Sequence, residues 1–192
     1  IVNNYFDAPI ITPPSQRNGE TAVITANDFV TPFFNMTIND NTIKEIASGI
    51  KTQFLLNNVF TNNFLSIRNN NISRSSSRAL TQGISLTSVI PSNLNGFGNN
   101  WNISDNKIIN CRNGIKVSGI RAADLIIDNN EIEMTGGAPL LTVRYGILLE
   151  NSYRTNIINN LVKGANGFAL NTLNKGIKVA FSNTTLVSCN DI

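Results

Sequence analysis

The stretch IDNNEI, residues 127–132, combines features that few local structures accommodate together. Its apolar ends, Ile127 and Ile132, are five residues apart with polar residues between them. On one continuous strand an odd separation directs the two side chains to opposite faces, and a helix favours separations of three or four. A sharp corner would bury both isoleucines, and Asn and Asp are the non-glycine residues that best tolerate the left-handed backbone of such a corner. The stretch is therefore predicted to form a strand, a corner and a second strand.

The same phrase recurs along the whole chain as apolar, any residue, Asn or Asp, Asn, any residue, apolar. The final copy, VSCNDI, has Cys189 in the third slot. The fourth slot is Asn in all seven copies, at intervals of 24 to 37 residues that average 31. These residues are Asn4, Asn41, Asn70, Asn106, Asn130, Asn160 and Asn190.

A second phrase, Gly-Ile, lies between the copies of the first. Its intervals are 30 to 34 residues, and the last four copies continue as GISL, GIKV, GILL and GIKV. Two interleaved phrases with one period indicate a repeat architecture. The phrase begins at Gly49, Gly83, Gly114, Gly146 and Gly176.

Stacking one such unit on the next predicts a chain wound into coils about 4.8 Å apart, the normal strand spacing, and six intervals give a rod of about 29 Å. The fourth-slot asparagines would lie above one another and bond their neighbours. Cys111 and Cys189 would lie about three coils apart, beyond disulfide reach. A set of antiparallel hairpins with Asn-Asn turns is the alternative, but the polar stretches after each corner do not suit a paired second strand.

The NNxI corners and GIxV strands resemble the right-handed parallel β-helix of the pectate-lyase-like superfamily over nearly the whole chain. The resemblance implies an all-β solenoid of about six to seven coils in a single domain, residues 1–192, which we interpret as a segment of a longer chain. It also implies that GIKV is a first strand, DLIID a second and EIEM a third, with ligands along the first strands. Many proteins that look like this one are trimeric bacteriophage tail spikes or secreted bacterial surface proteins.

The composition excludes several classes of function. The chain has 15 basic and 12 acidic residues and a net charge of +3, a low charge density for a nucleic-acid-binding protein. It has no histidine, the commonest metal ligand and general base. Its apolar stretches are too short to cross a bilayer. We therefore expect no nucleic-acid partner, no metal, no cofactor and no membrane insertion.

The residue after each Gly-Ile phrase is predicted to face solvent. Lys116 and Lys178 belong to this outward column, and a broken basic stripe suits an acidic polysaccharide, although exposed lysines also occur on sheets simply to prevent association. Loops beside this face were expected to contribute further substrate-binding residues. These are Trp101, on the stretch SVIPSNLNGFGNNWN, and Arg121, Arg144 and Tyr145. Alternatively, Trp101 packs its loop onto the coil.

Two carboxylates are candidates for catalysis. Glu150 and Asp124 are expected one coil apart near the same face, and glycoside hydrolysis commonly uses a pair of carboxylates about 5 to 9.5 Å apart. A lyase would instead need a basic residue near a bound uronate, with Lys116, Arg121 or Arg144 as candidates. The clustered Asp and Gly-His signature of polygalacturonases and the Arg-x-Pro-x-x-Arg pattern of pectate lyases are missing from the sequence.

The sequence thus favours a protein that binds or depolymerises a bacterial surface or acidic polysaccharide, either as a hydrolase or lyase or without catalysis. The expected location is extracellular, on a bacterial surface or a virion, and a homotrimer is a possible assembly. The alternative is a non-catalytic adhesive or structural repeat of a bacterial surface protein.

Overall fold

The computed structural model describes residues 1–7, 21–27, 35–54, 64–74, 80–88, 100–120, 124–134, 143–164 and 174–192. Within these ranges the chain forms strands, turns and bends, and no helix. All strand pairs are parallel, so the hairpin alternative is not what the structure shows. The described strands do not close into a barrel.

The strands lie in three stacks. The first stack comprises β2 (Thr21–Asn27), β5 (Ser48–Phe54), β8 (Leu80–Ser88), the second half of β10 (Lys107–Ser118), β13 (Arg144–Glu150) and β16 (Asn174–Ala180). The second comprises β3 (Asn35–Asn39), β6 (Phe64–Arg68), β9 (Asn100–Ser104), β11 (Asp124–Asp128), β14 (Thr155–Ile158) and β17 (Thr185–Ser188). The third comprises β1 (Tyr5–Asp7), β4 (Thr42–Lys44), β7 (Asn71–Ser73), the first half of β10, β12 (Glu131–Met134) and β15 (Leu161–Lys163).

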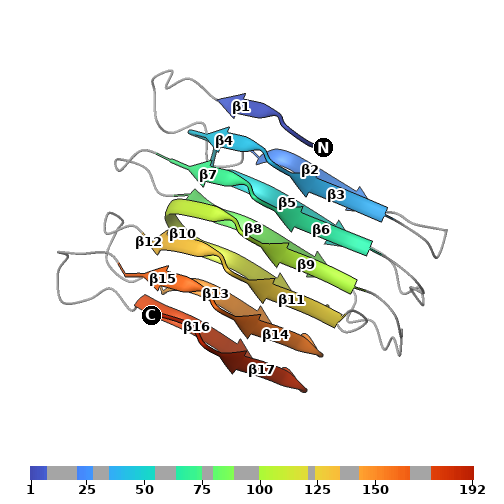
Figure 1. Ribbon diagram of the computed structural model, residues 1–192, viewed down its shortest axis with the longest axis vertical. Helices are drawn as coiled ribbons and strands as arrows, with labels where there is room; N and C mark the ends of the chain where they lie inside the picture. The colour runs from blue at the N-terminus through green and yellow to red at the C-terminus, as the bar shows by residue number, and fades with distance from the viewer. Residues whose placement is uncertain are drawn as a thin grey trace.

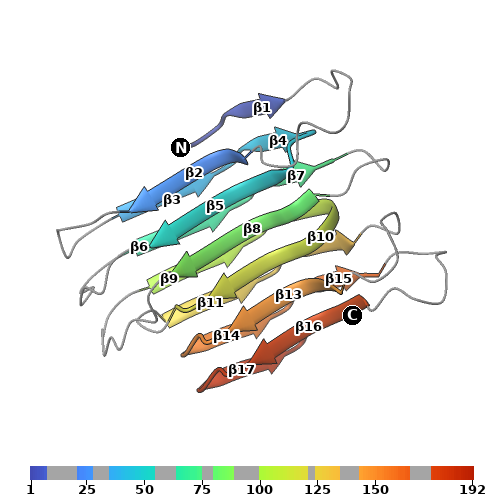
Figure 2. The same ribbon diagram turned by 180° about the vertical axis from the view of Figure 1, so that it is seen from behind.

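The chain visits the stacks in a fixed order of first, second and third, as in β2, β3 and β4 and again in β13, β14 and β15. We call one such pass a coil. Figures 1 and 2 show successive coils lying one above another along the long axis. The second stack is a separate 6-stranded sheet, whereas β10 joins the first and third stacks into an 11-stranded sheet. This connectivity is consistent with a parallel β-solenoid.

The predicted asparagine stack is confirmed. Each of the first six fourth-slot asparagines, from Asn4 to Asn160, donates from Nδ2 to the Oδ1 of the next, and the series ends at Asn190; the distances are 2.9 to 3.1 Å. The backbone N–H of each donates to the same oxygen. The five inner members are only 1% exposed, so the ladder is a buried, satisfied polar network.

The corner itself forms at the third slot. Its residues have φ values between 51° and 59°, in the left-handed region, and Cys189 adopts φ 54° like the others. Asn and Asp occupy this slot elsewhere because they tolerate this conformation at low cost. The corner allows the apolar residues on both sides of it, such as Ile127 and Ile132, to be fully buried.

Apolar side chains from all three stacks form one core. The isoleucines of the Gly-Ile phrases point inward, as predicted, and Ile84, Ile115 and Ile147 have no exposed surface. The residue before each of these isoleucines is glycine because there is no space for a side chain. A Cβ on Gly114 would lie 2.5 Å from the Ile132 Cγ2 and 2.6 Å from the Gly146 carbonyl oxygen. The strands therefore approach the third stack too closely for any side chain at this position.

Candidate functional site

The outward face of the first stack carries the predicted basic column. The strand register aligns its members through β5, β8, β10, β13 and β16. The aligned residues are Lys51, Ser85, Lys116, Leu148 and Lys178. The three lysines are partly exposed, whereas Ser85 and Leu148 are only 1% and 5% exposed, so the prediction that every member of this column faces solvent is wrong for these two residues. The column therefore presents a cation on every second coil.

Three of the predicted site residues meet at the C-terminal part of this face. The Lys178 Nζ lies 5.3 Å from the centre of the Tyr145 ring, within range of a cation–π interaction. The same Nζ lies 3.9 Å from the Glu150 Oε1, a long ion pair between partly exposed groups. The structure thus brings together a cation, an aromatic ring and a carboxylate, all accessible to solvent.

The second candidate carboxylate is Asp124. It begins β11 in the second stack, and its Oδ2 accepts a short hydrogen bond from the Arg154 guanidinium. Glu150 ends β13, at the other side of the connection between the first and second stacks. That connection is held by serine hydroxyls, since Ile120 N–H donates to Ser152 Oγ at 3.2 Å. Each candidate carboxylate is therefore paired with a cation of its own.

The remaining predicted residues have different positions. Trp101 lies on β9, not in a loop, and is 3% exposed within the core, as the packing alternative predicts. Its register partners are Leu65 and Leu125, which are also core residues. Arg144 begins β13 and has no exposed surface. Arg121 lies outside the described residues.

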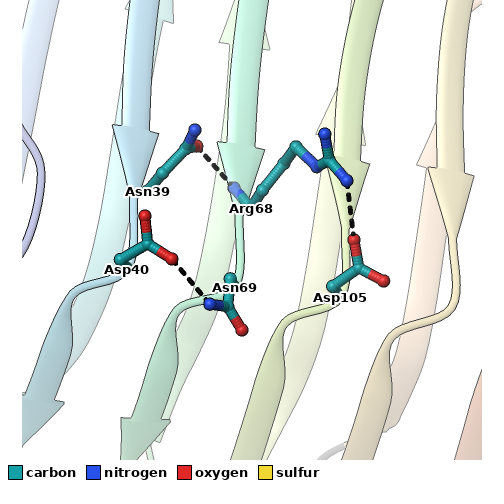
Figure 3. Close-up of a pocket in the computed structure, with 5 residues that line it drawn as sticks. All are labelled: Asn39, Asp40, Arg68, Asn69 and Asp105. Carbon is teal, nitrogen blue, oxygen red and sulfur yellow. Dashed lines mark hydrogen bonds and ion pairs between the residues drawn. The ribbon is translucent and has the colours of Figure 1, made fainter.

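A polar groove that the sequence interpretation did not predict lies along the corners. Its volume is about 480 Å³, and it is lined by Asn39, Asp40, Arg68, Asn69 and Asp105. Figure 3 shows these side chains on the outer side of the bends. Asn69 Nδ2 donates to Asp40 Oδ1 at 2.6 Å, and Arg68 Nη2 lies 3.2 Å from Asp105 Oδ2.

Asp105 also lines a second groove of about 340 Å³, which continues past Asn129 and Asn159. The hydrogen bond from the Asn129 amide is the largest cause that lowers the Asp105 pKa, and Ser104 and Arg68 lower it further. Asp105 is therefore ionised at neutral pH. The corner groove contains two acidic residues, Asp40 and Asp105, and one basic residue, Arg68. It is therefore net acidic and does not suit an acidic polymer.

The grooves could have been found from the spacing. Third-slot residues recur with the same period as the ladder, so their side chains must form a second outer column. The sequence pattern predicts a corner at the third slot but does not by itself reveal hydrogen bonds between the side chains of adjacent coils. In the structure Asp105 and Asp128 accept from Asn129 and Asn159 respectively, at 2.8 and 3.0 Å.

In the described part of the chain, no three His, Cys, Asp or Glu side chains group closely enough to hold a metal ion. Nor does any helix there have the length and apolar character to cross a membrane.

In comparisons with protein families, curated proteins and solved structures, the chain matches none of them. Its function is therefore argued from its own geometry.

Proposed function

We propose that the protein is an extracellular, right-handed parallel β-helix of about six to seven coils, of the pectate-lyase-like kind, that binds an acidic polysaccharide along its first stack. The location would be a bacterial surface or a virion, and a homotrimer is the assembly that the resemblance suggests. The supporting observation is the outward column in which Lys51, Lys116 and Lys178 alternate with uncharged residues.

The column favours a particular charge spacing in the ligand. Successive strands are about 4.8 Å apart, so lysines on alternate coils are about 9.6 Å apart. One sugar unit of an extended chain is about as long as one strand spacing. A polysaccharide with an acidic group on every second sugar would therefore place a carboxylate at each lysine.

The neighbouring groups suit the same ligand. The Tyr145 ring, partly exposed beside Lys178, can pack against the apolar face of a sugar. Ser85 and Leu148, between the lysines, are uncharged and buried, so they add no opposing charge to the face. Glu150 is the acidic residue on the adjacent column of Gln53, Thr87, Ser118, Glu150 and Ala180, so this face stays net basic.

Binding can be tested with charge-removing variants. Lys116→Gln with Lys178→Gln should weaken binding of a polysaccharide with alternating uronic acid by about tenfold or more, and binding should fall as salt concentration rises. The control is Lys44→Gln on β4, which removes one lysine charge from the third stack and is compared with each single lysine change. A neutral polysaccharide provides the ligand control. Equal affinity of the lysine variants and the wild type, or a preference for the neutral polymer, would refute the proposed track.

Depolymerisation is the catalytic form of this proposal, by a hydrolase or a lyase. Glu150 and Asp124 are the proposed catalytic carboxylates, and Lys116, Lys178, Tyr145 and Arg121 the proposed substrate-binding residues; Trp101 and Arg144, which the sequence also assigns to substrate binding, are buried. Combining Glu150→Ala with Asp124→Asn should abolish chain shortening of a bound polymer. Unchanged shortening would remove the catalytic assignment and leave the binding proposal intact.

A specific observation supports a non-catalytic adhesive rod as the second candidate. Glu150 and Asp124 are paired with Lys178 and Arg154, an arrangement in which each carboxylate is held by a cation. A protein that binds the polymer without shortening it, and whose binding survives the double carboxylate change, would be such an adhesive module.

A further inference from the structure

Arg144 is the side chain of the first stack that the proposed function explains least. It is fully buried, and none of Nε, Nη1 and Nη2 has a hydrogen-bond partner among the described residues. A guanidinium is protonated at any ordinary pH. A buried charge without a partner is strongly unfavourable, so native proteins pair such groups.

The groups around Arg144 make its charged form still less favourable. Asn113 on β10 pairs with Tyr145 on β13, so Arg112 and Arg144 occupy equivalent positions on adjacent strands. Burial is the largest cause that lowers the Arg144 pKa, and the charge of Arg112 lowers it further. The nearby Cys111 thiol does not compensate, since burial raises its pKa to about 12 and keeps it neutral.

The neighbouring sequence supplies no free carboxylate. Glu131 on β12 is already shared by Lys107 and Lys163, at 3.1 and 2.8 Å, and Glu133 is exposed. The segments that precede β13 and β16 in the chain, residues 135–142 and 165–173, contain neither Asp nor Glu. The described residues therefore give the Arg144 guanidinium neither a hydrogen-bond partner nor a neighbouring carboxylate.

We propose that Arg144 and Arg112 form an oxyanion-binding site that accepts a carboxylate, sulfate or phosphate group. Arginine suits this chemistry because its planar fork donates two parallel hydrogen bonds to such a group. Arg112 is partly exposed, so the pair extends from the interior to the surface. The group can come from a uronic acid of a glycan or from a free inorganic anion, and the site does not depend on the polysaccharide track for its existence.

Calorimetric titration of the 192-residue chain with inorganic sulfate, and separately with galacturonate, tests the site. Both should bind saturably at constant ionic strength, and Arg144→Met should weaken binding by about tenfold or more. Lys175→Met, which removes an exposed charge from β16, should leave binding unchanged. Equal binding by wild type and Arg144→Met, or no saturable binding of either probe, would overturn the proposal.

Thermal unfolding provides a second measurement that does not depend on one variant. In chloride alone, Arg144→Met should unfold at the same temperature as the wild type or higher, because it removes an uncompensated buried charge. Sulfate should then raise the melting temperature of the wild type more than that of the variant, beyond its general stabilising effect. A marked loss of stability in Arg144→Met in chloride would show that the protein itself already satisfies the guanidinium.

Two further variants extend the test if Arg144→Met does not fold. Arg112→Gln, at a partly exposed position, should also weaken sulfate binding, and Arg144→Lys should weaken it because the fork is lost while the charge remains. The outcomes separate the two proposals. Sulfate binding without polysaccharide binding would support this site and refute the track. Polysaccharide binding with unchanged affinity in Arg144→Met, together with no sulfate binding, would support the track and refute this site.

Discussion

At the scale of single residues, the fourth-slot asparagines determine the path of the chain. Asn130 donates from Nδ2 to Asn160 Oδ1 at 2.9 Å and to the Ile103 carbonyl at 2.9 Å. Its own Oδ1 accepts from the backbone N–H and the amide of Asn106, at 3.1 and 2.9 Å. One side chain therefore satisfies buried groups in three coils, and only the carboxamides of Asn and Gln offer this combination of donors and acceptor.

Asn130→Ala should lower the free energy of unfolding by about 1–3 kcal/mol, because buried donors and acceptors of the neighbouring asparagines lose their partner. Asn156→Ala is the matched control, since Asn156 is exposed on β14. Denaturant unfolding of the two variants measures the difference. Equal losses would mean that the ladder contributes no more than a surface amide.

Cys111 and Cys189 should differ sharply in reactivity. Cys111 is fully buried, with a pKa raised from 9.0 to about 12, whereas Cys189 is exposed, and both are free thiols. At pH 8 a thiol reagent should label the folded protein once, at Cys189, and twice after unfolding. Rapid labelling of Cys111 in the folded state would contradict this burial.

The same pKa has a consequence for stability. The folded state keeps the Cys111 proton up to about pH 12, whereas the unfolded thiol ionises near pH 9.0. Above pH 9 the unfolded state binds fewer protons, so stability falls as pH rises towards 12. Unfolding measured from pH 8 to 11 should show a smaller decline in Cys111→Ala than in the wild type. An identical decline in both would exclude this contribution.

At the scale of strands, the sequence predicted the corners and inward faces well because these depend on short-range spacing. IDNNEI places Ile127 and Ile132 correctly without knowledge of the rest of the chain. Trp101 was placed in a loop because the preceding residues are rich in Gly and Asn. Its position five residues before Asn106 equals that of Leu65 before Asn70, which would have identified it as a core residue.

Contacts between distant residues explain what the sequence did not predict. The link from Arg68 to Asp105 and the juxtaposition of Arg112 and Arg144 depend on strand register across irregular intervals. The intervals between repeats differ in length, so the alignment of these positions is visible only once the coils are stacked.

Gly114→Ala should destabilise the fold by about 1–3 kcal/mol, the usual effect of overfilling a packed site. The new methyl group would lie 2.5 Å from Ile132 and 2.6 Å from a backbone oxygen. Gly164→Ala is the control, because no atom lies within 4 Å of its Cβ position. Thermal unfolding should separate the two variants, and similar melting temperatures would argue against the close approach.

At the scale of the whole molecule, protection should vary along the axis. Leu149 and Ile157 in the coil of β13 and β14 have no exposed surface, whereas the equivalent Val179 and Val187 are 39% and 44% exposed. Hydrogen exchange of the 192-residue chain should therefore be slowest in β10 and β11 and faster in β16 and β17. Uniform exchange rates along the axis would indicate that the chain opens only as a single unit.

The ladder joins each asparagine only to the copies directly before and after it, and this locality has a consequence for engineering and for divergence. Each internal coil forms equivalent bonds with the coil before it and the coil after it. No interaction of the ladder therefore sets the number of coils. A tandem duplication of residues 131–160 should therefore be accepted as one additional layer, lengthening the protein by about 4.8 Å. The number of coils can thus change while the cross-section of the solenoid stays the same.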